Sequence, residues 1–248
     1  MTATLAQICR HPIKSHGRED LASVRLIAGQ GLPYDRHWAV AHEAAKLVPG
    51  WNPCVNFARG AKAPALMAIS AHLDEASGAV TLTHPDKTDL NFRPDSAADL
   101  ARFLDWARDL NPANRAQPVE IVKAGIAMTD TDFPSVSLFG LSSNSALSSR
   151  MGQDLSPQRW RGNLWIDGLT PWEEFDWVGH DVQIGDAVLH VQERIVRCKA
   201  TSANPATGQI DADTLGALND GFGHQDFGVY ARVISGGLVS LGDKVSVL

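Results

Sequence analysis

The sequence predicts a mainly β fold with a few helices, an α+β protein. Short stretches in which apolar and polar residues alternate, ended by Gly or Pro turns, recur along most of the chain and are typical of half-buried strands. The chain also contains an internal echo. Residues 182–191 and 239–248 each carry an apolar residue, then Gly-Asp, then alternating valines, as in a strand that bends tightly and continues along a sheet. Short strands at this spacing suggest a closed barrel.

In the first half, the alternation predicts strands over 4–9, 23–27 and 34–41, and a hairpin of 66–73 with 79–83. Lys14 and Ser15 then lie in a loop that follows the first strand, between Pro12 and Gly17. Arg36 falls where the third strand would begin, so its side chain can point back towards the Lys14 loop.

A helix follows the hairpin. Asp95 or Ser96 can cap it, apolar residues recur at helical spacing from Leu100 to Leu110, and Pro112 ends it. The residues just after Pro112 are the predicted domain boundary, which gives domains of 1–115 and 116–248.

The second half is expected to be mostly β, with strands over 119–123 and 164–168. Between them, 139–141 leads into a Ser-rich helix start that closes near Gly152. The hydroxyls of this start and its free N–H groups make a candidate anion site. A short helix is predicted within 211–219.

Composition limits the class of protein. The chain has 248 residues, 44% hydrophobic and 20% charged, which is ordinary for a globular protein, and its formal net charge of −6 argues against a general nucleic-acid-binding surface. No segment has the roughly 20 apolar residues of a membrane helix, and residues 1–14 lack the features of a secretory signal. We therefore expect a cytoplasmic protein without a nucleic-acid or membrane partner.

Cys198 is the first candidate functional residue. Arg197 and Lys199 flank it at the end of a predicted strand, and two adjacent cations favour the thiolate form needed by a nucleophile or a soft-metal ligand. The alternative is a small, half-buried hydrophobic residue. The three cysteines, Cys9, Cys54 and Cys198, are far apart, which excludes a zinc ribbon or a ferredoxin-type cluster built by this chain alone.

Basic residues are the second candidate set. They fall at predicted strand ends or loops, which a barrel brings together, and with Ser142, Ser143 and Ser145 they would suit a phosphorylated or otherwise anionic cofactor. The alternative is a scatter of solvated charges. The cations are Lys14, Arg18, Arg36, Arg159, Arg161, Arg197 and Lys199. The histidines show no metal-binding spacing, and no Gly-x-Ser-x-Gly elbow indicates a hydrolase.

Five segments together carry a family resemblance. These segments follow one another in the same order as in MOSC-domain proteins, which the sequence therefore resembles and which are named for the molybdenum cofactor sulfurase C-terminal domain. The sequence is similar over nearly its whole length to the mitochondrial amidoxime reducing component and its bacterial relatives. The segments are His11-Pro12-Ile13-Lys14-Ser15, Gly31 to Trp38, Arg159 to Leu164, Cys198 to Gly208, and Phe227-Gly228-Val229-Tyr230. The resemblance implies an N-terminal MOSC β-barrel domain packed on a MOSC β-barrel. The chain departs from the family pattern in the insert 51–62, at Gly162 in place of Pro, and at Asn204 in place of Asp.

The resemblance also implies site roles. Cys198 would be the catalytic residue and the protein ligand of molybdenum in a pterin-type molybdenum cofactor (Mo-molybdopterin). The pterin and its phosphate would be held by Lys14, Ser15, Arg36, Arg161, Asn163 and Thr201. Arg197, Ser142 and Ser143 are added as cofactor-binding candidates because of their charge or hydroxyl group and their predicted positions.

The expected function is a molybdenum-dependent reductase of N-hydroxylated or N-oxidised compounds. The chain lacks the motifs of an iron–sulfur, flavin or nicotinamide module, so a separate ferredoxin- or haem-type donor with its reductase is expected to supply electrons. The alternatives are a sulfur-transfer or cofactor-carrier protein in which Cys198 carries a persulfide, and a cofactor-free interaction barrel.

Overall fold

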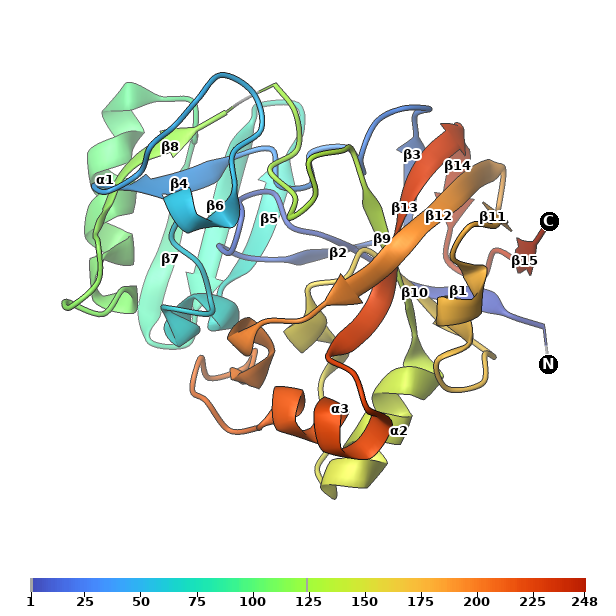
Figure 1. Cartoon of the computed structure of the whole chain (residues 1–248). Coiled ribbons are helices and arrows are strands. Elements are labelled where there is room, and N and C mark those ends of the chain that lie inside the picture. The colour runs from blue at the N-terminus through green and yellow to red at the C-terminus, as the bar shows by residue number, and fades with distance from the viewer. Residues whose placement is uncertain (1, 124) are drawn as a thin grey trace.

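The largest element of the computed structural model, which describes residues 2–123 and 125–248, is an eight-stranded sheet (Figure 1). Its strands follow the order β15-β11-β12-β13-β9-β10-β1-β2. Their bounds are β1 Thr4–Arg10, β2 Glu19–Leu21, β9 Val136–Gly140, β10 Leu164–Asp167, β11 Asp181–Ile184, β12 Ala187–Val196, β13 Asp226–Ser235 and β15 Val245–Val247. β9 and β10 pair in parallel, whereas β12 pairs antiparallel with β13.

Three smaller sheets complete the β-structure. β3 (Ser23–Leu26) pairs with β14 (Gly237–Ser240), and β4 (Ala39–His42) pairs with β8 (Pro118–Val122). β5 (Ser70–Asp74), β6 (Ala79–His84) and β7 (Lys87–Phe92) form an antiparallel meander. In Figure 1, β4 to β8 lie on the opposite side of the molecule from β11 to β15.

The α-helices are α1 (Ala97–Ala107), α2 (Leu141–Met151) and α3 (Thr214–Phe222). α1 packs on β7 and β8, and α2 and α3 lie side by side below the large sheet (Figure 1). α1 and α2 confirm the sequence prediction. α2 ends at Gly152, which adopts a left-handed conformation, and α3 is capped by the Asp213 carboxylate, which accepts from the Gly216 amide.

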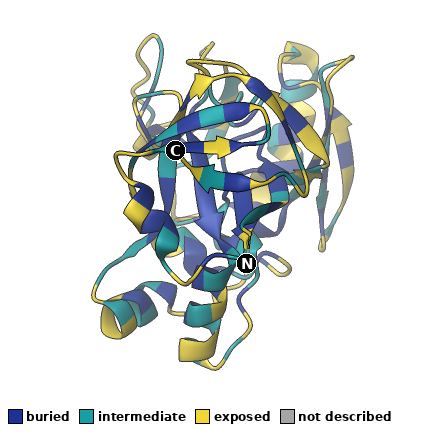
Figure 2. Ribbon diagram, turned by 90° about the vertical axis from the view of Figure 1, so that its right-hand side faces the viewer, coloured by how far each residue is buried: buried dark blue, intermediate teal, exposed yellow. Residues whose placement is uncertain are grey.

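Two main hydrophobic cores support these sheets. One lies inside the large sheet, where Leu138, Ile166 and Val229 are fully buried, and the other lies under β4 to β7, where Leu82 and Phe103 are fully buried. The alternation of buried and exposed residues along the strands is visible in Figure 2. Burying each such side chain contributes roughly 1.5–3 kcal/mol, so both cores hold their sheets firmly in place.

The fold class is confirmed as mainly β with helices, but the expected closed barrels are not formed by the strand ladders of the described residues. The first residues of β1 do reach the far edge of the large sheet, through backbone hydrogen bonds to Asp243 and Gly242 and one isolated bridge between Thr4 and Lys244. The Val245 amide also donates to the Ala3 carbonyl at 2.9 Å, so β1 and β15 meet near their ends without being joined by a strand ladder.

Some predicted boundaries are wrong. The strand expected over 34–41 begins only at Ala39, because Tyr34 and Arg36 lie in a turn with positive φ, and the expected 66–73 strand starts as a 3-10 turn over Pro64–Ala68. β7 was not predicted. The division into 1–115 and 116–248 stays a prediction, since β1 pairs with β10 and β4 with β8 across that point.

Candidate functional site

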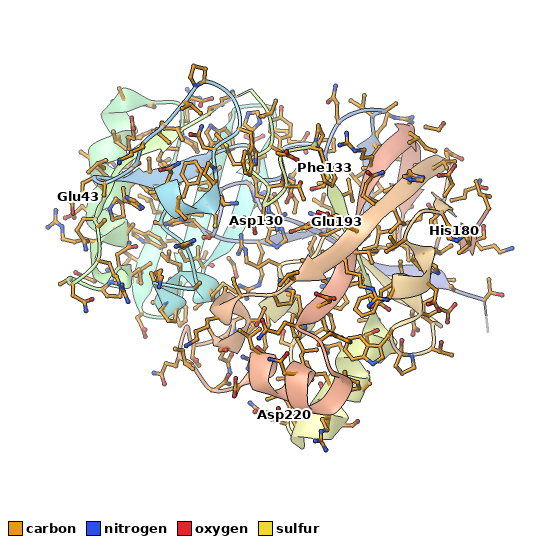
Figure 3. All side chains as sticks on the ribbon, in the orientation of Figure 1. Glu43, Asp130, Phe133, His180, Glu193 and Asp220 are labelled. Atoms are coloured by element: carbon orange, nitrogen blue, oxygen red, sulfur yellow. The ribbon has the colours of Figure 1, made fainter. Side chains whose placement is uncertain are left out.

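A cavity of about 150 Å³ lies between the two groups of strands and gathers most of the predicted site residues. Figure 3 labels Asp130 in this central region. Of the predicted residues, the cavity is lined by Lys14, Ser15, Arg36, Arg161, Arg197 and Cys198, and also by the basic residue Arg159. A larger hollow of about 550 Å³ beside residues 29–37 has only Lys123 as a Lys or Arg among its lining residues, so the smaller cavity is the candidate site.

Lys14 reaches the cavity from the tight turn that follows β1. Its amide donates to the Trp38 carbonyl at 2.8 Å, which ties the loop to the start of β4. The buried ammonium donates to the Met128 carbonyl and to the Asp130 carboxylate, both at 2.7 Å. Lys14 is therefore a fixed point charge whose anionic partner within the protein is Asp130.

Arg36 is held by a buried carboxylate. Asp35 is 2% exposed, accepts from the His11 amide at 2.8 Å and forms a short ion pair with Arg36. Burial alone would raise the pKa of Asp35, but the Arg36 charge and the His11 hydrogen bonds hold it below its ordinary value. Arg36 also donates to the Arg161 carbonyl at 2.8 Å, so this side chain joins two walls of the cavity.

His11 belongs to the same cluster. Burial, with the charges of Arg161 and Arg36, lowers the pKa of His11 to about 3, so the imidazole is neutral at pH 7. Its ring nitrogen lies 3.2 Å from Arg36 Nη1. The ring thus adds no further positive charge to a wall that already holds two guanidinium groups.

Neither Arg161 nor Arg197 forms an ion pair with a carboxylate of the described residues, whereas Arg36 and Arg159 do. Arg161 Nη2 donates to the Gly17 carbonyl and Arg197 Nη2 donates to the Trp160 carbonyl, but Arg161 Nη1 and Arg197 Nε are buried without a partner in that part of the chain. Burial, with repulsion from Arg36 and Arg18, lowers the pKa of Arg161 to about 9, and burial lowers the pKa of Arg197. Buried N–H groups of this kind fit an anionic ligand.

Strained backbone is concentrated at the same place. Among the described non-glycine residues with positive φ, Ser15 (63°), Arg36 (47°) and Arg161 (52°) all line the cavity. Such conformations cost of order 1–3 kcal/mol each and persist where the surrounding structure enforces them, as at binding sites. The strained residues therefore lie on three separate chain segments that meet at the cavity.

Cys198 lies two residues after the end of β12 and is exposed, whereas Cys9 is buried. The structure therefore does not support the alternative in which Cys198 is a core residue. The next turn fixes its backbone: the Thr201 amide and hydroxyl both donate to the Cys198 carbonyl, at 3.2 and 3.1 Å, and the Thr201 hydroxyl also meets that of Thr214.

Thr201 is thus placed behind Cys198, and three other predicted residues also lie away from the cavity lining. The Asn163 side chain accepts a hydrogen bond from the Ser137 hydroxyl and donates one to the Cys9 carbonyl. Ser143 donates to the Glu174 carboxylate at 2.8 Å, and the Gly140 amide also donates to Glu174. The start of α2, which the sequence predicted to be an anion site, therefore meets a carboxylate of the chain itself.

Ser142 Oγ is buried without a partner among the described residues, and it does not line the cavity. Of the other basic residues in the predicted set, Arg18 donates to the carbonyls of Met67, Ile69 and Pro205, so it joins three segments, and Lys199 is exposed.

The sequence reasoning missed several cavity residues. Asp130 pairs with Lys14, and Cys54 and Arg59 come from the loop-rich insert. Tyr230 closes the segment Phe227-Gly228-Val229-Tyr230, and burial, with the Asp130 charge, raises its pKa to about 12. Nothing in the local sequence around Asp130 shows that it would meet Lys14, 116 residues away.

The chemistry of this arrangement is that of a site for a multiply charged anion next to an exposed thiol. No group of three or more His, Cys, Asp and Glu side chains placed to hold a metal ion occurs within the described residues. A metal at Cys198 would therefore have to bring its other ligands with it. None of the helices in the described ranges is long and apolar enough to cross a membrane.

Comparison with known proteins links this geometry to a family. The model described as the MOSC N-terminal beta barrel domain matches residues 2–117, and that of the MOSC domain matches residues 129–246. The molybdenum cofactor sulfurase of Anopheles gambiae is 36% identical over 78 residues, which are 31% of this chain and 10% of that protein. The chain thus matches about a tenth of the length of that relative.

Among solved structures, the chain is similar to the YuaD protein from Bacillus subtilis, with 12% identity over 99% of this chain and 94% of the other, at a TM-score of 0.48. YiiM from Geobacillus stearothermophilus is 18% identical over 46% of this chain and 53% of its own, at a TM-score of 0.36.

Proposed function

The chain belongs to the MOSC family, with an N-terminal MOSC β-barrel domain and a MOSC domain, and from this premise we propose that it binds molybdenum cofactor and reduces N-hydroxylated or N-oxidised compounds. The observation that carries the proposal is a single cavity that combines the exposed Cys198 with two half-buried arginines, Arg161 and Arg197, each of which has a buried N–H without a partner and no carboxylate in ion-pair contact among the described residues.

The residues present fit the phosphate of such a cofactor. Arg161 Nη1 and Arg197 Nε offer two N–H groups that find no acceptor elsewhere in the described chain, and Lys14 adds a point charge on the same cavity. Guanidinium groups bind phosphate oxygens with defined geometry, and the penalty of burying these N–H groups is removed when an anion accepts from them. Arg36 would act mainly through Arg161, whose carbonyl it holds.

Cys198 fits the metal end. A thiolate is a soft ligand of the kind that sulfur-rich metal centres take, and the flanking turn fixes the Cys198 backbone so that its side chain is presented to the cavity. When bound, the cofactor would supply a metal centre that exchanges two electrons. The protein contributes position and charge compensation.

Removal of an N-bound oxygen as water consumes two protons as well as two electrons, so the ionisation of the cavity residues matters. The side chain of Asp130 is largely exposed, and the charges of Lys14 and Arg36 hold its pKa below its ordinary value, so Asp130 is a carboxylate at pH 7. Tyr230, with a pKa of about 12, keeps its phenolic proton and remains a hydrogen-bond donor for a substrate oxygen.

Electrons would come from a separate protein, a ferredoxin- or haem-type donor with its reductase. The chain has three scattered cysteines and no dinucleotide-binding Gly-x-Gly-x-x-Gly motif. Steady amidoxime reduction by the purified chain with NADH alone would refute this part of the proposal.

Metal analysis and turnover test the proposed function together. Freshly purified protein from a host that makes the cofactor is expected to contain near-stoichiometric molybdenum and fluorescent pterin, and to reduce benzamidoxime with an artificial reductant. Cys198→Ser replaces a soft thiolate by a harder, much less acidic oxygen, so we expect pterin to remain and reduction to fall by at least about 100-fold. Full activity in this variant would refute the ligand role of Cys198.

A second function, sulfur transfer or cofactor delivery, is favoured by the segment similar to the molybdenum cofactor sulfurase. In this case the exposed Cys198 carries a persulfide, and Cys198→Ser abolishes sulfur transfer while any metal-centred reduction persists. Molybdenum binding without amidoxime turnover would favour this second function.

A further inference from the structure

The cavity holds more positive charge than a phosphate needs. Six basic side chains line it, and three of them are paired with carboxylates: Lys14 with Asp130, Arg36 with Asp35, and Arg159 with Asp211. Arg59, Arg161 and Arg197 pair with no carboxylate in the described ranges. A phosphate monoester carries a charge of about −2 at most, so two of these three guanidinium groups suffice to balance it.

Arg161 and Arg197 belong together. Arg161 follows the 3-10 turn Pro157–Trp160, Arg197 donates to the Trp160 carbonyl, and both present a buried N–H without a partner among the described residues. They are the pair that best suits the phosphate. Arg59 comes from the insert and is the cation left over.

The insert holds Arg59 in a defined position beside the Cys198 turn. The amides of Lys62 and Ala63 both donate to the Arg59 carbonyl, at 2.9 and 3.0 Å. A Cβ on the adjacent Gly60 would lie 3.5 Å from the Ala200 side chain, so this backbone packs against the turn that begins at Cys198.

The guanidinium of Arg59 is only partly committed. Arg59 Nη1 donates to Cys54 Sγ at 3.0 Å, and within the described residues the Arg59 side chain makes no other hydrogen bond. The side chain is half-buried, and none of its other nitrogen atoms is among the buried, unpaired atoms of the described residues. Those N–H groups therefore remain available to a ligand that enters from solvent.

We propose that Arg59 selects substrates that carry an anionic group, a carboxylate, sulfonate or phosphate, on an apolar body. The apolar body is suggested by Met67 and Ala200, which line the cavity next to Arg59 and Cys198. This inference rests on the proposed reductase function, because it names the substrate class of the same site. In a partly desolvated site, a guanidinium–carboxylate contact discriminates strongly against a neutral analogue.

The test compares benzamidoxime with 4-carboxybenzamidoxime on the cofactor-loaded protein. Binding is measured by calorimetry without reductant, and kcat and KM are measured with reductant. We expect wild type to prefer the carboxylated compound, and Arg59→Gln to lower that preference about tenfold or more, in line with the loss of one charged hydrogen bond. Arg59→Lys should restore part of the preference through its charge, and the effect should lie in Kd and KM rather than kcat.

Lys62→Gln is the matched control. Lys62 lies on the same insert and carries the same charge, but it lines a second hollow that Arg59 also borders, with His42 and Asn111, and not the Cys198 cavity. We expect its preference between the two compounds to equal that of wild type. A loss of preference in Lys62→Gln equal to that in Arg59→Gln would overturn the inference, because the effect would then be a general one of surface charge.

Two other outcomes would also overturn it. If Arg59→Gln changes the binding of both compounds equally, Arg59 does not contact the anionic group. If Arg59→Gln loses its pterin, Arg59 holds the cofactor phosphate instead of the substrate. If neither compound is reduced but carboxylate binding still depends on Arg59, the reductase proposal fails while the anion selectivity of Arg59 stands.

Discussion

Arg161→Gln should make the cofactor-free chain more stable while it weakens anion binding. The charge of Arg161 is buried, repelled by Arg36 and Arg18, and its pKa is lowered from 12.5 to about 9, so the ionised form costs stability in the folded state. At roughly 1.4 kcal/mol per unit, that cost is at most about 5 kcal/mol. The substitution also removes the hydrogen bond to the Gly17 carbonyl and some packing, worth roughly 2–3 kcal/mol together.

The expected net gain is therefore at most about 2–3 kcal/mol, which raises Tm by at most roughly 12 °C in a chain of this size. The opposite sign is expected for phosphate. Loss of one charged hydrogen bond of about 1.5–3 kcal/mol should lower phosphate affinity by about 10- to 100-fold. Urea unfolding and calorimetric phosphate titration of the cofactor-free protein measure both quantities.

Arg159→Gln provides the control for this experiment. Arg159 is also a buried guanidinium at the cavity, 2% exposed, but it pairs with Asp211 at 2.7 Å. Its removal leaves the partly exposed Asp211 carboxylate with only the Asn204 amide as partner, so we expect destabilisation of about 1–3 kcal/mol. Equal destabilisation by Arg161→Gln and Arg159→Gln, or unchanged phosphate affinity in Arg161→Gln, would show that Arg161 carries no uncompensated charge.

Three further outcomes are expected. Arg36→Ala leaves the buried Asp35 without its cation and should lower the free energy of unfolding by about 3–5 kcal/mol, with Arg36→Lys less affected; a smaller loss in urea unfolding would contradict the pairing. Asp130→Asn frees Lys14 from an exposed partner, so phosphate affinity should rise roughly two- to fivefold by calorimetry, and weaker binding would count against it. Gly162→Ala places a Cβ 2.4 Å from the Phe139 ring and should cost about 1–3 kcal/mol, largely recovered by adding Phe139→Leu; no recovery would exclude this clash as the cause.

Local sequence predicted what local forces decide. Alternating apolar residues gave the strand at Thr4, and helical spacing with a Pro stop gave α1, because each pattern is set by neighbours within one element. Left-handed conformations at Tyr34 and Arg36 could not be predicted in this way, since these residue types do not favour positive φ. Tertiary contacts impose them, such as the hydrogen bond from the Arg36 amide to the His11 carbonyl.

The sequence could predict which cations belong to the candidate site, but it could not predict which of them are paired with carboxylates. Their positions at predicted strand ends and the family resemblance both select four cations as site residues, and all four line the cavity: Lys14, Arg36, Arg161 and Arg197. Which cations are neutralised depends on carboxylates far away in the sequence, such as Asp130, 116 residues from Lys14. No residue pattern records that pairing, although it decides which guanidinium groups remain available to a ligand.

Phe139 shows that the residue type at some positions can be explained only when the packing of the core is known. Its ring lines the cavity and stacks on Trp165 and Phe227, and a Cβ at Gly162 or at Gly228 would lie 2.4 Å from it, on opposite edges of the ring. The family resemblance led us to expect Pro at position 162, and in this chain Phe139 fills the space that a residue larger than Gly162 would need. The departure from the family pattern is therefore a packing requirement of this cavity wall, imposed by an aromatic residue that lies 23 positions earlier in the chain.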